Sequence, residues 1–195
     1  NCRIWVPEAK HLGKPIIITL QGTACSAALL RDTEADAPGA ESFPLSEQSI
    51  LDKIKHTISI YTKSPSVDKL ELEIYGHSLG GADAQHLFAS LLGKIAEQVQ
   101  SLKEAKSLED TEKISSDEAF LKVRRLSMMV CNSPAVTAQV ATKAHKDASY
   151  LAKNDIGINI TISVDYYFAA ADLIQKGGHT HVLLKGVDTA LARVR

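Results

Sequence analysis

One stretch of the sequence combines residue types and spacing that suit covalent chemistry: Gly76-His77-Ser78-Leu79-Gly80-Gly81. A serine hydroxyl is a weak nucleophile until a base takes its proton, and it must project from the backbone to reach a substrate. A Gly-x-Ser-x-Gly turn between a strand and a helix gives this projection, because its glycines relieve crowding at a sharp bend. Ser78 is therefore the candidate nucleophile.

The segments on either side have the periods that such a turn requires. Residues 70–75, Leu-Glu-Leu-Glu-Ile-Tyr, alternate apolar and polar side chains, which predicts a strand. From Ala82 to about Gln98 the apolar residues recur at helical spacing, which predicts a helix. The first N–H groups of a helix are free and its dipole favours negative charge, so the N–H of Leu79 is a candidate donor to an oxyanion.

Further strands and helices are expected to alternate along the chain. Helices are predicted over 46 to about 62 and over 134 to about 153, and strands over 14–20, 126–131, 158–164 and 182–184. This alternation predicts an α/β fold, with a mostly parallel central sheet and helices on both faces. Ligands of such sheets bind at the carboxyl ends of the strands, where Ser78 is expected to lie.

Length, composition and charge limit the classes of function. A chain of 195 residues predicts a single domain over 1–195, and its start at Asn1 rather than Met suggests a fragment of a longer protein or a processed product. The net charge of −1 offers no basic face for nucleic acid. No apolar run approaches the roughly 18 residues of a transmembrane helix. The charged stretch 100–120 predicts an exposed helix or an insertion, with a lid over the site as the functional alternative.

No metal or other cofactor is expected. Cys2, Cys25 and Cys131 are too widely spaced for a disulfide framework or a zinc site, and free cysteines mildly favour a reducing compartment. His179 and His181 would lie on the same side of an extended segment, so both side chains could bind one metal ion. However, no cluster of carboxylates or cysteines completes a site around them.

Three motifs resemble one family. Residues 74–82, Ile-Tyr-Gly-His-Ser-Leu-Gly-Gly-Ala, resemble the nucleophile region of the class 3 (fungal and plant type) lipases of the α/β-hydrolase fold. Leu20-Gln21-Gly22-Thr23 is similar to a Phe-Arg-Gly-Thr/Ser stretch of that family, although Gln21 replaces the usual arginine. This similarity implies that the N–H of Thr23 is the second oxyanion donor. Asn132-Ser133-Pro134 is similar to the turn after the next strand, so the resemblance covers about residues 14–175.

The resemblance also implies an acid and a base. The family's acid lies in an Asp-x-Val/Ile pattern, which Asp172 fits, while the alternative, Asp165, falls inside a run of strand-forming residues. The base should follow the acid in the chain. Only His179 and His181 do so, and both precede the last predicted strand. His181 is the first candidate, and His179 or a histidine outside these 195 residues are the alternatives.

These residues predict a serine esterase or lipase-like hydrolase that forms an acyl-enzyme on Ser78. The resemblance implies a lipid or other hydrophobic acyl ester as substrate, with transient contact with a membrane surface. A catalytically inactive interaction module and a fragment that lacks its catalytic histidine are the alternatives. Similar lipase-like domains occur in large bacterial proteins, including secreted effectors, so the bacterial cytoplasm and secretion are both candidate locations.

Overall fold

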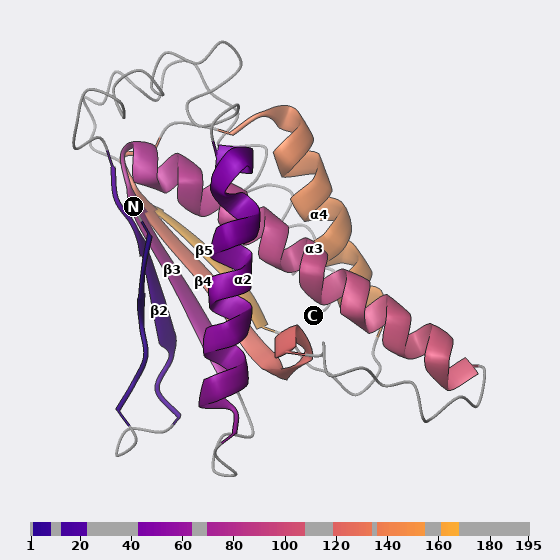
Figure 1. Ribbon diagram of the computed structural model, residues 1–195. Helices are drawn as coiled ribbons and strands as arrows, with labels where there is room; N and C mark the ends of the chain where they lie inside the picture. The colour runs from indigo at the N-terminus through magenta and orange to yellow at the C-terminus, as the bar shows by residue number, and fades with distance from the viewer. Residues whose placement is uncertain are drawn as a thin grey trace.

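Strands and helices alternate along the chain in the computed structural model, which describes residues 2–8, 13–22, 43–63, 70–107, 119–133, 136–154 and 161–167 (Figure 1). The strands are β1 (Cys2–Trp5), β2 (Ile16–Leu20), β3 (Leu70–His77), β4 (Val123–Cys131) and β5 (Thr161–Tyr167). The helices are α2 (Phe43–Tyr61), α3 (Leu79–Ser107) and α4 (Ala138–Lys153), with the short 3-10 helix η3 (Ala119–Lys122) before β4.

The five strands form one sheet in the order β1-β2-β3-β4-β5. β1 is antiparallel to β2, and the pairs β2–β3, β3–β4 and β4–β5 are all parallel. Parallel neighbours need a crossover connection, and α2, α3 and α4 each lie between two successive parallel strands. This arrangement confirms the predicted α/β class with a mostly parallel sheet.

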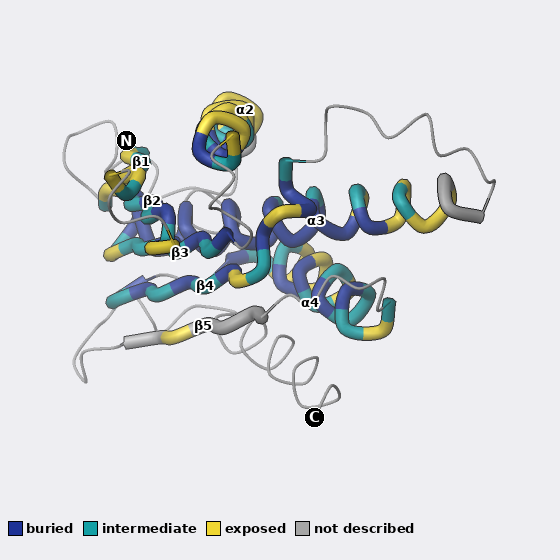
Figure 2. The backbone as a smooth tube through the Cα atoms, turned by 90° about the horizontal axis from the view of Figure 1, so that it is seen from below, coloured by how far each residue is buried: buried dark blue, intermediate teal, exposed yellow. Residues whose placement is uncertain are grey.

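The three helices lie on one face of the sheet (Figure 2). Right-handed crossovers that always step to the next strand on the same side return over the same face. The strands carry the matching pattern: in β3, Leu70 and Leu72 are buried, while Glu71 and Glu73 on the opposite face are partly exposed. The predicted helices on both faces are therefore not seen in the part of the chain that the structure describes.

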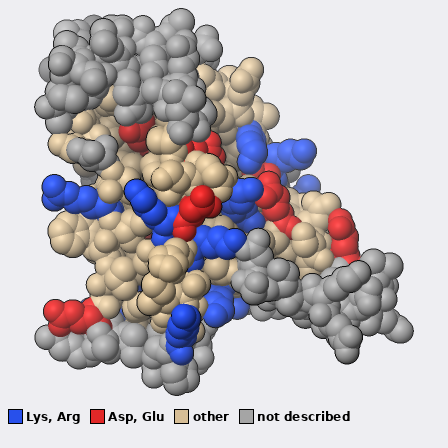
Figure 3. All heavy atoms as spheres, in the orientation of Figure 1, with Lys and Arg blue, Asp and Glu red and all other residues tan. Residues whose placement is uncertain are grey.

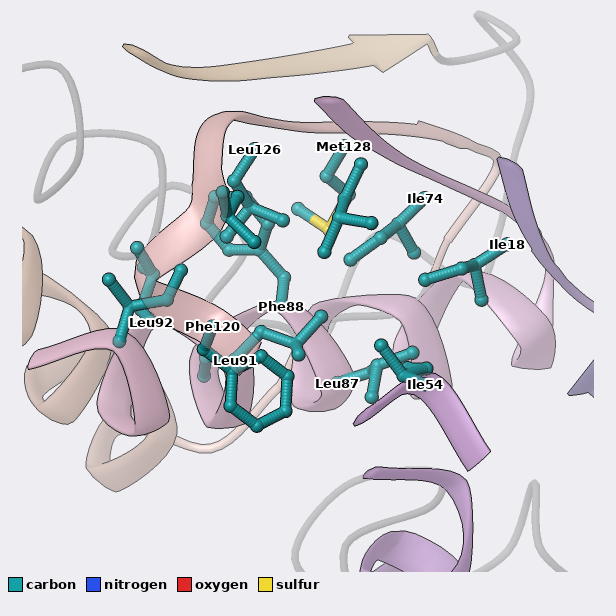
Figure 4. Packing of buried hydrophobic residues seen from close by; sticks show 14 of the residues in the cluster. Ile18, Ile54, Ile74, Leu87, Phe88, Leu91, Leu92, Phe120, Leu126 and Met128 are labelled. Atoms are coloured by element: carbon teal, nitrogen blue, oxygen red, sulfur yellow. The ribbon is translucent and has the colours of Figure 1, made fainter. Parts of the chain in front are cut away.

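Side chains from the covered face meet the helices in one apolar core (Figure 4). Ile18, Ile74 and Met128 are neighbours across β2, β3 and β4, and none is more than 1% exposed. Ile54 of α2 and Leu87 of α3 are buried in the same cluster. Each such side chain contributes about 1.5–3 kcal/mol when it leaves water. The core therefore fixes α3, and with it the first turn of α3, against the strand ends.

Several element bounds differ by a few residues from the sequence-based expectation, and two elements differ by more. The edge strand β1 was not predicted, because four residues allow only two alternations; Cys2 and Ile4 are partly buried, whereas Arg3 and Trp5 are exposed. α3 continues to Ser107 instead of ending near residue 98, so the first part of the charged stretch forms its last turns. Residues 108–118 and the predicted strand 182–184 lie outside the described ranges.

Charged side chains of both signs are interspersed on the face shown in Figure 3. Two ion pairs each join residues within one helix: Lys94 with Glu97 at 2.9 Å in α3, and Lys143 with Asp147 at 3.0 Å in α4. No helix in the described ranges is both long and apolar enough to cross a membrane.

Candidate active site

Ser78 is the single residue between a strand and a helix. β3 ends at His77, α3 begins at Leu79, and Ser78 adopts a φ of 54°. This left-handed backbone region costs a residue with a side chain roughly 1–2 kcal/mol. Strained residues of this kind persist where the surrounding structure holds them, and they cluster at functional sites. The predicted sharp turn at the carboxyl end of the sheet is thus present, with its strain at the candidate nucleophile.

The turn closes because two glycines let backbone segments approach each other. A Cβ at Gly76 would lie 2.7 Å from the Cα of Gly81, so the end of strand β3 is in close contact with the first turn of α3. A Cβ at Gly80 would lie 2.6 Å from the carbonyl carbon of Gln21 and 2.8 Å from the nitrogen of Gly22. Backbone cannot move aside as a side chain can, so both positions require glycine.

Backbone hydrogen bonds tie Ser78 to both neighbouring elements. Its N–H donates to the carbonyl oxygen of Cys131 at 3.0 Å, at the end of β4. Its carbonyl oxygen accepts the N–H of Gly81 at 2.8 Å and that of Ala82 at 3.4 Å, inside α3. The Ser78 residue itself is partly exposed, while His77 beside it is exposed. The hydroxyl-bearing residue is therefore held by its backbone at an accessible edge of the sheet.

Of the two predicted oxyanion donors, the structure describes Leu79. Its side chain is buried at 1% exposure, and it is the first residue of α3. The first N–H groups of a helix have no partner within it, and the helix dipole favours an anion there. Thr23 lies outside the described ranges. The preceding Gly22 is close to the turn, since a Cβ there would lie 3.4 Å from the Cβ of Ser78.

Of the two candidate acids, Asp165 lies within the residues that the structure describes and Asp172 does not. Asp165 is exposed and lies within β5, opposite Met129 of β4, which in turn pairs with Tyr75. Tyr75 precedes Ser78 by three residues, and a strand rises about 3.3 Å per residue, so Asp165 is level with a point about 10 Å short of the turn. Asp172 and both candidate bases, His179 and His181, lie outside the described ranges.

The turn after β4 holds residues that sequence reasoning found only by resemblance or not at all. Asn132 has a φ of 46°, the second non-glycine residue in the left-handed region among those described. Ser133 is fully buried, and its Oγ accepts a hydrogen bond from Nε2 of Gln85 at 2.8 Å. Gln85 was not predicted to matter. Its only signal in the sequence is a long polar side chain among the apolar residues of the helix, which implies a buried partner.

The described cysteines and histidines form no metal cluster. Cys2 and Cys131 are free and partly buried, and Cys25 lies outside the described ranges. Burial raises the pKa of the Cys2 thiol, which keeps this thiol protonated at neutral pH. His86 is buried and its ring stacks on Phe43, with 5.4 Å between the ring centroids.

Comparisons of this chain with models of known protein families, with curated proteins and with solved structures found no match. The functional interpretation therefore depends on the geometry around Ser78 and on the sequence motifs.

Proposed function

We propose that this chain is a serine hydrolase of the α/β-hydrolase type, which cleaves carboxylic esters through an acyl-enzyme on Ser78. The observation that carries the proposal is the φ of 54° at Ser78, at a strand-to-helix junction closed by Gly76 and Gly80. This is the backbone geometry that a Gly-x-Ser-x-Gly nucleophile turn requires. A glycine would adopt this φ with less strain, so a serine at this position lowers the stability of the fold.

In the first half of the reaction, Oγ of Ser78 forms a bond to the carbonyl carbon of the ester. Its proton passes to a histidine, with His181 as the first candidate, and the carbonyl electron pair moves onto oxygen. The N–H groups of Leu79 and Thr23 stabilise that oxyanion. The electron pair then returns, the ester C–O bond breaks, and the alcohol leaves with the proton from the histidine. Asp172 orients the imidazole and stabilises its charged form.

In the second half, water replaces the alcohol. The histidine takes a proton from water as the oxygen attacks the acyl carbon, and the same two N–H groups stabilise the second oxyanion. The bond between the acyl carbon and Oγ of Ser78 then breaks, and Oγ recovers its proton from the histidine. A carboxylic acid is released and the enzyme returns to its starting state without a cofactor.

The family resemblance of residues 74–82 and 20–23 favours a lipid or other hydrophobic acyl ester over a charged one. A transient contact with the membrane surface would then bring the substrate to the enzyme. Esters of different acyl length test this part of the proposal separately from the chemistry, because every serine esterase shares the acyl-enzyme step.

The test is hydrolysis of p-nitrophenyl butyrate and octanoate, together with labelling by a fluorophosphonate probe. Ser78→Ala is expected to abolish labelling and to lower turnover by several orders of magnitude. Ser101→Ala is the matched control, because Ser101 is an exposed serine on α3, the helix that follows Ser78. It is expected to behave as the unchanged chain does.

Each outcome decides something. Turnover and labelling that depend on Ser78 support a hydrolase whose base lies within these residues. Labelling that is equal in the unchanged chain and in Ser78→Ala refutes the role of this serine. A folded chain that neither labels nor hydrolyses any ester favours the interaction module, and the same assay on a longer form of the protein then tests for a histidine outside residues 1–195.

A further inference from the structure

A buried polar contact connects the helix after the serine turn with the strand end beside it. Nε2 of Gln85, on α3, donates a hydrogen bond to Oγ of Ser133 at 2.8 Å, and both residues have 0% exposure. The two residues are 48 positions apart in the sequence. A buried amide that loses its partner is costly, so this contact fixes the distance between α3 and the turn after β4.

Ser133 also lies against the serine turn. A Cβ at Gly81 would be 2.5 Å from the Cβ of Ser133 and 2.6 Å from its Oγ, so the first turn of α3 presses on this serine. Gly81 in turn donates its N–H to the carbonyl oxygen of Ser78 at 2.8 Å. On the other side of Asn132, the carbonyl oxygen of Cys131 accepts the N–H of Ser78. Cys131, before Asn132, thus contacts Ser78 directly, and Ser133, after Asn132, lies against Gly81, which is bonded to Ser78.

We propose that Gln85 is a positioning residue for Ser78, which acts by holding Ser133 and the turn after β4. Ser78 and Asn132 both have left-handed backbones, at φ values of 54° and 46°, and neighbouring contacts must hold such conformations. The contact between Gln85 and Ser133 supplies this hold from inside the protein, where water does not compete. The inference builds on the proposed nucleophilic role of Ser78.

The first test measures the backbone without any reaction. Gln85→Leu removes the donor and keeps a similar volume. Hydrogen exchange of the Ser78 amide is expected to become roughly tenfold faster, relative to the amide of Ile74 in β3, because local opening of the turn requires less free energy than global unfolding. A general loss of stability would accelerate both amides. Ile54→Val serves as the matched control, since Ile54 is a buried core residue of α2, an element that does not form the serine turn.

The second test measures reactivity. In Gln85→Leu the rate constant for fluorophosphonate labelling of Ser78 is expected to fall roughly tenfold to a hundredfold, with little change in the KM for p-nitrophenyl butyrate, because a small misplacement of a reacting group mainly slows the chemical step. Ile54→Val is expected to label at the unchanged rate. In a Ser133→Ala background the Gln85→Leu change should have little further effect, since its partner is already absent.

Ser133→Ala alone is the second variant if Gln85→Leu does not fold, and it is expected to change exchange and labelling in the same direction. If the Ser78 amide of a folded variant exchanges at the same rate as in the unsubstituted chain, the inference is overturned, whether or not the chain has activity. Unchanged labelling in an active chain overturns it as well. If the chain without substitutions does not react with the fluorophosphonate probe, this result contradicts the proposed function alone. The exchange measurement still decides the role of Gln85.

Discussion

The amide N–H of Ser78 donates a hydrogen bond to the carbonyl oxygen of Cys131 at 3.0 Å, so the residue that follows β3 is bound to the last residue of β4. The bond extends the β3–β4 ladder one residue beyond His77. The carbonyl of Ser78 has meanwhile turned into α3, where it accepts the N–H of Gly81 at 2.8 Å. Ser78 therefore belongs to the sheet through its N–H and to the helix through its C=O, and this division holds its φ at 54°.

Ser78→Gly is expected to be more stable than Ser78→Ala by about 1 kcal/mol, because glycine adopts a left-handed backbone without the steric cost of a Cβ. Both variants remove the hydroxyl, so the comparison isolates the backbone from the chemistry. Urea unfolding of the two proteins measures the difference in the free energy of unfolding. Equal midpoints would show that the left-handed conformation is not strained at this position.

Gly80→Ala is expected to lower the free energy of unfolding by about 1–3 kcal/mol, because the new methyl group would press on the backbone of Gln21 and Gly22. Gly93→Ala in the same helix is the matched control. A Cβ at Gly93 meets only the ends of the Lys143 and Asp147 side chains, which can move, so helix propensity should make this change neutral or stabilising by up to about 1 kcal/mol. Thermal or urea unfolding compares the two, and equal effects would refute the close approach at Gly80.

The strands and the serine turn could be predicted because their signals are local. The alternation in residues 70–75 identified the buried face of β3, and the spacing of Gly76, Ser78 and Gly80 identified the turn. The same alternation also indicated that the opposite face of β3, which carries Glu71 and Glu73, is not packed against a helix. Strands that are buried on both faces tend to be continuously apolar, whereas Glu71 and Glu73 alternate with leucines. In the part of the chain that the structure describes, the helices cover β3 on one face only, as that pattern indicates.

Contacts between distant residues could not be predicted in this way. Gln85 and Ser133 are joined across 48 positions, and no period in the sequence pairs one with the other. The end of α3 was also missed, because a charged stretch can continue a helix whose buried face lies earlier in the chain.

Glu73→Gln is expected to lower the pKa of Tyr75. The Tyr75 hydroxyl donates to Oε2 of Glu73 at 2.7 Å, and this hydrogen bond is the main reason that the pKa of Tyr75 is raised above its ordinary value. A pKa raised by folding stabilises the protein below the unfolded pKa of about 10, and this contribution is lost as the pH rises through the folded pKa. Ultraviolet titration of phenolate, with Tyr75→Phe to assign the signal, measures the shift. An identical titration curve in Glu73→Gln would contradict the expectation.

Asp172→Asn is expected to lower kcat for p-nitrophenyl butyrate by up to about 10⁴-fold, as the loss of the orienting acid does in known serine proteases. Asp165→Asn is the matched control and should leave kcat unchanged, because Asp165 is exposed within β5 and opposite Met129, short of the turn. Steady-state kinetics of the two variants compare the candidates directly. A large loss in Asp165→Asn alone would assign the acid to β5 instead.

His181→Ala is expected to remove nearly all Ser78-dependent turnover, while His179→Ala retains most of it. The base must reach the hydroxyl of Ser78, and the two imidazoles are separated by one residue, so only one of them can occupy that position at a time. The kcat values of the two variants, compared with that of Ser78→Ala, identify the base. The reverse pattern assigns it to His179. If both variants keep full Ser78-dependent turnover, neither histidine takes the proton, and the base must be another group.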